Sequence, residues 1–109
     1  MKIAYFVTRN ATNELLNGWL LMTLAKGAHY AEVVAMHFCE DGVYHLVKGS
    51  DAAGKIEKAH RRGTKILACA CSVENRGLEQ LLLEGVKIAH LPQFYEICEK
   101  AGVDHILTV

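Results

Sequence analysis

Five short apolar segments alternate along the chain with longer segments in which apolar residues recur every three to four positions. Most of the short segments are continuously apolar, which is typical of strands that helices cover on both faces. The alternation therefore predicts an α/β fold with three layers, α/β/α, around a five-stranded parallel sheet. The predicted strands are Lys2–Val7, Glu32–Phe38, Lys65–Cys71, Val86–Ala89 and His105–Val109.

Helical spacing and capping signals predict the segments between these strands. The predicted helices cover residues 15–24, 41–47, 51–62, 72–85 and 91–101, the fourth with a break at Gly77. Their expected cap residues are Asn10, Thr12, Asn13, Ser50 and Ser72. Pro92 suits the first turn of the last helix. The inward stripe of that helix is expected to consist of Leu91, Phe94, Tyr95, Cys98 and Ala101.

Composition and charge narrow the class of protein. The 109 residues fit one domain, residues 1–109, and the 51% hydrophobic and 22% charged residues are ordinary for a globular chain. Twelve basic residues balance twelve acidic ones, so no basic field predicts a nucleic-acid partner. The apolar start, Ile3–Val7, is far shorter than a signal peptide core or the roughly 20 residues of a membrane span. We therefore expect a cytoplasmic protein that does not contact membranes.

The strongest candidate chemistry lies at the end of the third predicted strand. Ligands and catalytic groups of parallel sheets gather at the carboxyl ends of the strands. Cys69 and Cys71 stand there, directly before a predicted helix, whose first N–H groups favour a thiolate over a thiol. Such a thiolate can hold a sulfur atom as a persulfide. The alternative is that both cysteines are small apolar residues that fill the strand.

The spacing of the four cysteines leaves two further uses open. Without an export signal their thiols are expected to stay reduced. If the strand continues through Cys71, both side chains point to the same face, and Cys71 can assist or resolve Cys69, although a Cys-x-Cys disulfide is strained. Alternatively, His37 and Cys39 end the second strand in the same way, which supplies four possible zinc ligands without an established zinc spacing. The simpler interpretation is that His37, Cys39 and Cys98 are packed core residues.

Nucleotide cofactors are not predicted. No G-x-G-x-x-G follows the first predicted strand, and no G-x-x-x-x-G-K-[ST] occurs in the chain. We expect no cofactor.

The whole chain resembles the DsrE/DsrF-like (DsrEFH-like) family of small sulfur-relay proteins. The opening strand and long helix resemble the start of that family, and the run Phe38-Cys39-Glu40-Asp41-Gly42-Val43 resembles the end of its second strand. The third likeness is a cysteine seven residues before an Arg-Gly pair, here Cys69 and Arg76-Gly77. Glu84-Gly85-Val86 and the Leu91-Pro92 helix start are also similar to the family.

The resemblance implies a function and a set of site residues. Aligned on Arg76-Gly77, the sulfur-accepting cysteine of the family falls on Cys69, with Cys71 as an additional thiol. The implied protein is a sulfurtransferase-like carrier, which accepts sulfane sulfur as a persulfide on Cys69 and passes it to a partner. Its partners would be sulfur donor and acceptor proteins, and its subunits would form trimers or hexamers. The residues expected around the thiols are Asn10, Asp41, Tyr44, Ser72, Asn75 and Arg76.

Two other functions compete with the carrier. In one, the chain is a non-catalytic binding or assembly subunit of a sulfur or redox complex, with inert thiols and an oligomer that buries Trp19 or Tyr44. In the other, Cys69 and Cys71 bind a soft metal together with Cys39 or His37. Thiol reactivity separates the carrier from the first alternative, and metal content separates it from the second.

Overall fold

The computed structural model describes residues 1–10 and 13–109, without the side chain of Asn13, so the cap candidates Thr12 and Asn13 lie outside the described groups. The helix η1 is a π-helix and η2 is a 3-10 helix. The elements in chain order are β1 (Lys2–Val7), α1 (Asn13–Leu15), η1 (Leu16–Leu20), α2 (Leu21–Ala25), β2 (Glu32–Phe38), η2 (Glu40–Leu46), α3 (Ala53–Arg61), β3 (Lys65–Cys69), α4 (Ala70–Asn75), β4 (Lys87–Ala89), α5 (Leu91–Ala101) and β5 (His105–Thr108).

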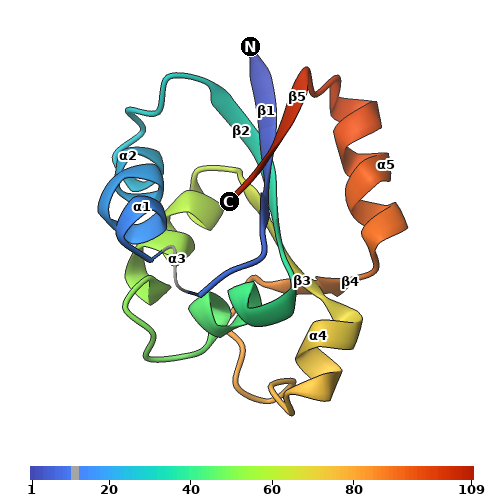
Figure 1. The fold of residues 1–109 in the computed structure, drawn as a ribbon. Coiled ribbons are helices and arrows are strands. Elements are labelled where there is room, and N and C mark those ends of the chain that lie inside the picture. Colours follow the sequence, from blue (N-terminus) through green and yellow to red (C-terminus); the bar gives the residue numbers. More distant parts are fainter. Residues whose placement is uncertain (11–12) are drawn as a thin grey trace.

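The five strands form one parallel sheet in the order β4-β3-β2-β1-β5. Helices α1, α2 and α3 lie on one side of this sheet and α5 lies on the other (Figure 1). The predicted α/β/α architecture is confirmed. Within the part of the chain that the structure describes, no helix has the length and apolar character needed to span a bilayer.

Each face of the sheet has its own apolar core. The larger core lies under η1, α2, α3 and η2, and it includes Ile3, Leu16, Met36, Phe38 and Ile56. The smaller core lies under α5 and is formed by Ala4, Ala35, Leu67, Ala89, Phe94 and Cys98. Because Cys98 is buried there, its predicted role as a core residue is confirmed.

The segment after β3 departs most from the prediction. Helix α4 ends at Asn75, and Gly77 then adopts a φ of 63°, a left-handed conformation that suits glycine and stops a helix. The predicted continuation to residue 85 is therefore wrong. Residues 81–83 instead bond to the end of η2 and the chain just after it, through Leu83 N–H to the Leu46 carbonyl and Lys48 N–H to the Leu81 carbonyl. The apolar residues whose spacing suggested a helix instead anchor this loop to the core, in which Leu78 and Leu83 are buried.

Smaller differences concern caps and helix faces. Ser50 does not cap α3, because its hydroxyl donates to the carbonyl of His45. In α5, Phe94 and Cys98 are buried as predicted, whereas Leu91 and Tyr95 are exposed. The inward stripe of α5 is therefore narrower than expected.

Candidate functional site

A tight turn follows the carboxyl end of β2, beside the end of β1. The N–H of Cys39, the first residue after β2, donates to the carbonyl of Val7 at 2.9 Å. Glu40 then adopts a φ of 50°, and the N–H of Gly42 donates to the Cys39 carbonyl at 2.9 Å. This turn directs η2 across the end of β1 and sets the position of Asp41 and Tyr44.

Cys69 lies beside this turn as the last residue of β3 and the N-cap residue of α4. It is half-buried. The β2–β3 register pairs Phe38 with Ala68, so Cys39 and Cys69 are the next residues of the two neighbouring chains. Burial raises the pKa of the Cys39 thiol to about 11, and the neighbouring Cys69 adds to this effect. The sheet edge therefore holds a buried thiol next to a more accessible one.

Cys71 is not on the strand that the sequence predicted for it. Strand β3 ends at Cys69, and Cys71 is an exposed residue in the first turn of α4. Residues two positions apart on a helix do not face each other. The expectation that Cys69 and Cys71 extend one strand and share its face is therefore wrong.

Ser72 links α4 to the turn after β2. Its buried hydroxyl oxygen accepts a hydrogen bond from the N–H of Glu40 at 2.8 Å. The helix begins at Ala70 with Cys69 as N-cap, so the predicted role of Ser72 as the cap is wrong. Ser72 nevertheless lies at the site, because its hydroxyl holds the turn at Glu40 against α4.

Arg76 joins the same two elements at the surface. Its Nε and Nη2 donate to Asp41 Oδ1 at 3.3 and 3.0 Å, and its Nη1 donates to the Ser72 carbonyl at 3.2 Å. Its guanidinium carbon also lies 5.9 Å from the centre of the Tyr44 ring. The structure thus brings together four of the predicted site residues, Asp41, Tyr44, Ser72 and Arg76, at the edge that holds Cys69.

The contacts described for this group do not include two predicted site residues. Asn75 is exposed at the end of α4, and Asn10 is exposed beyond the end of β1. In residues 1–10 and 13–109, neither forms a hydrogen bond with Asp41, Ser72 or Arg76. Their predicted roles gain no support from the described contacts.

His37 is packed between aromatic rings on the α5 side of the sheet. Its ring lies 5.6 Å from that of Phe6 and 5.2 Å from that of Phe94. Its buried Nδ1 has no hydrogen-bond partner among the described residues. Burial lowers the pKa of His37 to about 4, so the ring is neutral near pH 7. The interpretation of His37 as a packed strand residue is confirmed.

The soft-metal alternative lacks a set of ligands. Among the described side chains, no three His, Cys, Asp or Glu residues are grouped so as to hold a metal ion. The packing of His37 between two phenylalanines also removes one of the ligands that this alternative used. The thiols of Cys39 and Cys69 are therefore the candidate reactive groups at the carboxyl edge of the sheet.

Replacing Ser72 by alanine is expected to lower the free energy of unfolding by about 1–2 kcal/mol, because the Glu40 N–H loses its acceptor. The matched control is Asn75→Ala on the same helix, which changes an exposed side chain and is expected to stay within about 0.5 kcal/mol. Urea unfolding of the two variants measures the difference. Equal stabilities would contradict the role given to Ser72.

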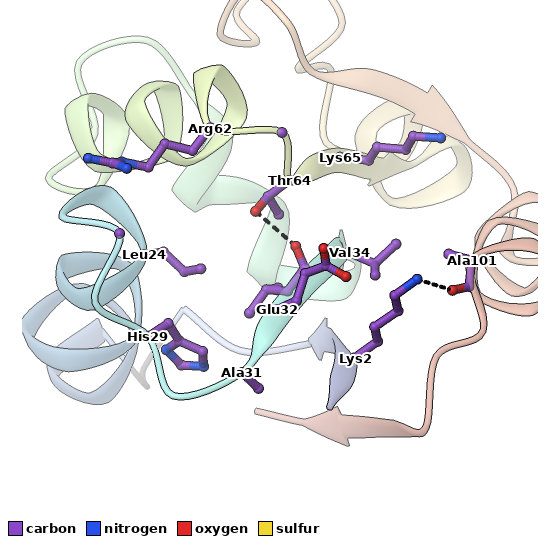
Figure 2. A pocket seen from close by; sticks show the side chains of 13 residues that line it. Lys2, Leu24, His29, Ala31, Glu32, Val34, Arg62, Thr64, Lys65 and Ala101 are labelled. Atoms are coloured by element: carbon purple, nitrogen blue, oxygen red, sulfur yellow. Dashed lines mark hydrogen bonds between the residues drawn. The ribbon is translucent and has the colours of Figure 1, made fainter.

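A separate hollow of about 490 Å³ lies at the opposite edge of the sheet. It is lined by the starts of β1, β2 and β3 and by the end of α2, and no cysteine lines it. In Figure 2, Lys2 Nζ donates to the Ala101 carbonyl and the Thr64 hydroxyl donates to the Val33 carbonyl. The polar groups of this hollow are thus partly used in holding the strand starts, and the hollow is separate from the thiol site.

The fold and the site define a small α/β protein with a cysteine at the carboxyl end of a central parallel strand. The chain belongs to the DsrE/DsrF-like family, whose profile matches residues 1–109.

Solved structures with the same fold agree with this assignment. The E. coli ychN protein is 18% identical, with a TM-score of 0.74 and coverage of 100% of both chains. MTH1491 of Methanobacterium thermoautotrophicum, a protein of unknown function, is 17% identical, with a TM-score of 0.74 over 97% of both chains. BT1422 of Bacteroides thetaiotaomicron, a conserved protein of unknown function, is 17% identical, with a TM-score of 0.73 over 99% of this chain and 94% of that one. At these identities the likeness shows the fold alone. No curated protein matches the sequence.

Proposed function

We propose that this protein is a sulfur carrier of the cytoplasm, which accepts sulfane sulfur as a persulfide on Cys69 and passes it to an acceptor protein. The observation that carries the proposal is the half-buried Cys69 thiol at the carboxyl edge of the sheet, where β3 meets α4. Membership of the DsrE/DsrF-like family supports the sulfur-relay class.

The proposed transfer is a thiol exchange at sulfur. The Cys69 thiolate attacks the outer sulfur of a donor persulfide, a new S–S bond forms, and the donor leaves as a thiolate. The acceptor thiolate then attacks the outer sulfur on Cys69, which leaves as a thiolate in turn. The charged side chains at this edge act on the pKa of the neighbouring Cys39 in opposite directions, since Glu40 raises it and the guanidinium of Arg76 lowers it. Asp41 holds that guanidinium in place through its carboxylate.

The test is intact-mass spectrometry of the reduced protein after incubation with a low-molecular-weight persulfide. We expect the wild type and Cys71→Ser to gain the mass of one sulfur atom and Cys69→Ser to gain none. Cys71→Ser is the matched control, because it removes the more exposed thiol and leaves Cys69 in place. No adduct on Cys69, under conditions that load a known persulfide carrier, would remove the carrier function.

We also propose that the subunits assemble into trimers or hexamers. Trp19 and Tyr30 are 44% and 64% exposed, and their rings are grouped at one place on the surface. Both rings lie against His29, at 5.6 and 4.8 Å between ring centres. His29 is itself held by hydrogen bonds with Tyr5 Oη at 3.0 Å and Thr23 Oγ1 at 2.8 Å. The exposed rings of Trp19 and Tyr30, fixed in place against His29, also favour the second candidate function, a non-catalytic binding or assembly subunit.

Native mass spectrometry tests the assembly. We expect a trimer or hexamer for the wild type, and smaller species for a variant in which Trp19 and Tyr30 are both replaced by serine. Leu81→Ser, which changes another exposed apolar residue, is the control and is expected to keep the assembly. A monomeric wild type at micromolar concentration would contradict this proposal.

A further inference from the structure

Two thiols stand at the same level of the sheet on neighbouring strands. The parallel register runs from Ala35 beside Lys65 to Phe38 beside Ala68, and Cys39 and Cys69 come next in each chain. Both residues have extended backbone there, Cys39 with φ −139° and ψ 174° and Cys69 with φ −61° and ψ 121°. The register therefore continues geometrically to this pair.

The two side chains also project to the same side. Side chains alternate along a strand, so Cys39 and Cys69 share the face of His37 and Leu67, which lie two residues before them. His37 stacks on Phe94 and Leu67 belongs to the core that contains Phe94, so this is the α5 face. Cys71, in contrast, lies on α4 and is exposed.

The spacing of neighbouring strands suits a disulfide. Paired strands lie about 4.8 Å apart, and disulfides join residues whose Cα atoms are about 4.4–6.8 Å apart. Cys69 also acts electrostatically on Cys39, which agrees with the proximity that the register implies. Of the three other cysteines, Cys39 is therefore the one in register with Cys69.

We propose that Cys39 is the resolving thiol of Cys69, which closes a Cys39–Cys69 disulfide and expels the sulfur that Cys69 carries. The proposal rests on the proposed persulfide on Cys69. The Cys39 sulfur attacks the inner sulfur, the Cys39–Cys69 bond forms, and the persulfide bond breaks. The outer sulfur leaves as hydrosulfide, and the proton of the Cys39 thiol passes to solvent. The sulfane sulfur gains two electrons, which the two cysteine sulfurs supply.

The burial of Cys39 determines whether disulfide closure or transfer to the acceptor protein happens first. A buried thiol forms its thiolate rarely, so closure is slow and an acceptor protein can take the sulfur first. Sulfur that no acceptor collects is released as hydrosulfide, and Cys69 is held as a disulfide until a dithiol reduces it. The pair therefore limits how long a reactive persulfide persists.

The first arm of the test does not need a persulfide. The Cys71→Ser protein is treated with dithiodipyridine, a small aromatic disulfide that forms a mixed disulfide with Cys69. We expect Cys39 to displace the second pyridinethione, so that the protein loses two hydrogens and peptide mapping finds Cys39 joined to Cys69. With Cys39→Ala or Cys39→Ser added, the mixed disulfide persists. Adding Cys98→Ala instead, which changes another buried cysteine, leaves closure intact.

The second arm loads the same proteins with a persulfide and follows hydrosulfide release after the donor is removed. Removal of Cys39 is expected to lengthen the lifetime of the adduct by at least about tenfold. An unchanged lifetime, or a mixed disulfide that persists beside Cys39, overturns the inference and leaves the carrier function standing. If Cys69 takes up no persulfide sulfur but the Cys39–Cys69 disulfide still closes in the first arm, the carrier function is contradicted, whereas the pairing of the two thiols is supported. Circular dichroism of each variant verifies that it is folded.

Discussion

Replacing Phe94 by alanine is expected to lower the free energy of unfolding by about 3–5 kcal/mol. Phe94 is fully buried and is the largest side chain of the smaller core, where it lies 5.2 Å from the His37 ring and 6.2 Å from the Phe6 ring between centres. Removing its ring would leave a cavity between α5 and the sheet, lined by Phe6, His37 and the rest of this core. The control is Tyr95→Ala on the same helix, at a side chain that is 52% exposed, with an expected loss of less than about 1 kcal/mol.

The same variant has a second measurable effect, on His37. Burial holds the pKa of His37 at about 4, and the unfolded value is about 6.5. The unfolded chain therefore binds a proton first as the pH falls, and the wild type loses this part of its stability between about pH 6.5 and pH 4. Loss of the Phe94 ring admits water, so the pKa of His37 should rise, as a histidine NMR titration would show. An unchanged pKa would mean that the Phe94 ring does not shield His37.

Replacing Gly42 by alanine is expected to destabilise the fold by about 3 kcal/mol. A Cβ atom at Gly42 would clash with the backbone carbonyl oxygen of Val7, the last residue of β1, and a strand backbone cannot easily give way. Helix η2 would have to move away from β1, and Asp41 and Tyr44 would move with it. Gly54→Ala is the matched control, because Gly54 lies in α3 and has no neighbour within 4 Å of that position.

The two glycine variants are expected to change stability in opposite directions. Alanine favours a helix over glycine by about 0.5–1 kcal/mol, so Gly54→Ala should be slightly more stable than the wild type. Thermal and urea unfolding measure both. A stable Gly42→Ala protein would show that η2 can lift from β1 at little cost.

The sheet was the most predictable part of the fold. Buried parallel strands are marked by continuous apolar runs, and β1 and β2 have the predicted bounds. The end of β3 could not be predicted, because Cys71 and Ala70 are small residues that suit a strand or a helix. A tertiary contact decides between strand and helix at these residues. The Ser72 hydroxyl accepts a hydrogen bond from the N–H of Glu40, thirty-two residues earlier, and this bond holds the start of α4 over the end of β2.

The sequence predicted which residues meet at the candidate site better than how they are arranged. The rule for parallel sheets pointed to the edge that holds Cys69, and Arg76 and Asp41, far apart in sequence, do meet there. The sequence placed Cys39 near Cys69 only as a possible metal ligand and took Cys71 as the partner thiol, because Cys71 is closer along the chain whereas Cys39 is closer across the sheet. In the structure Cys39 and Cys69 each follow the fourth residue of the paired segments that begin at Ala35 and Lys65, a register that the sequence alone does not give.

The position of β5 in the sheet has a consequence for protein synthesis. Strand β1 lies between β2 and β5, and its residue Tyr5 pairs with Leu107 of β5. During synthesis, β5 therefore leaves the ribosome long after β2. Contacts between residues so far apart in sequence are slow to form. Until β5 emerges, the nascent chain exposes the free edge of β1, and free edges pair readily with strands of other chains. Crowded ribosomes on one message would therefore bring together chains at their most aggregation-prone stage.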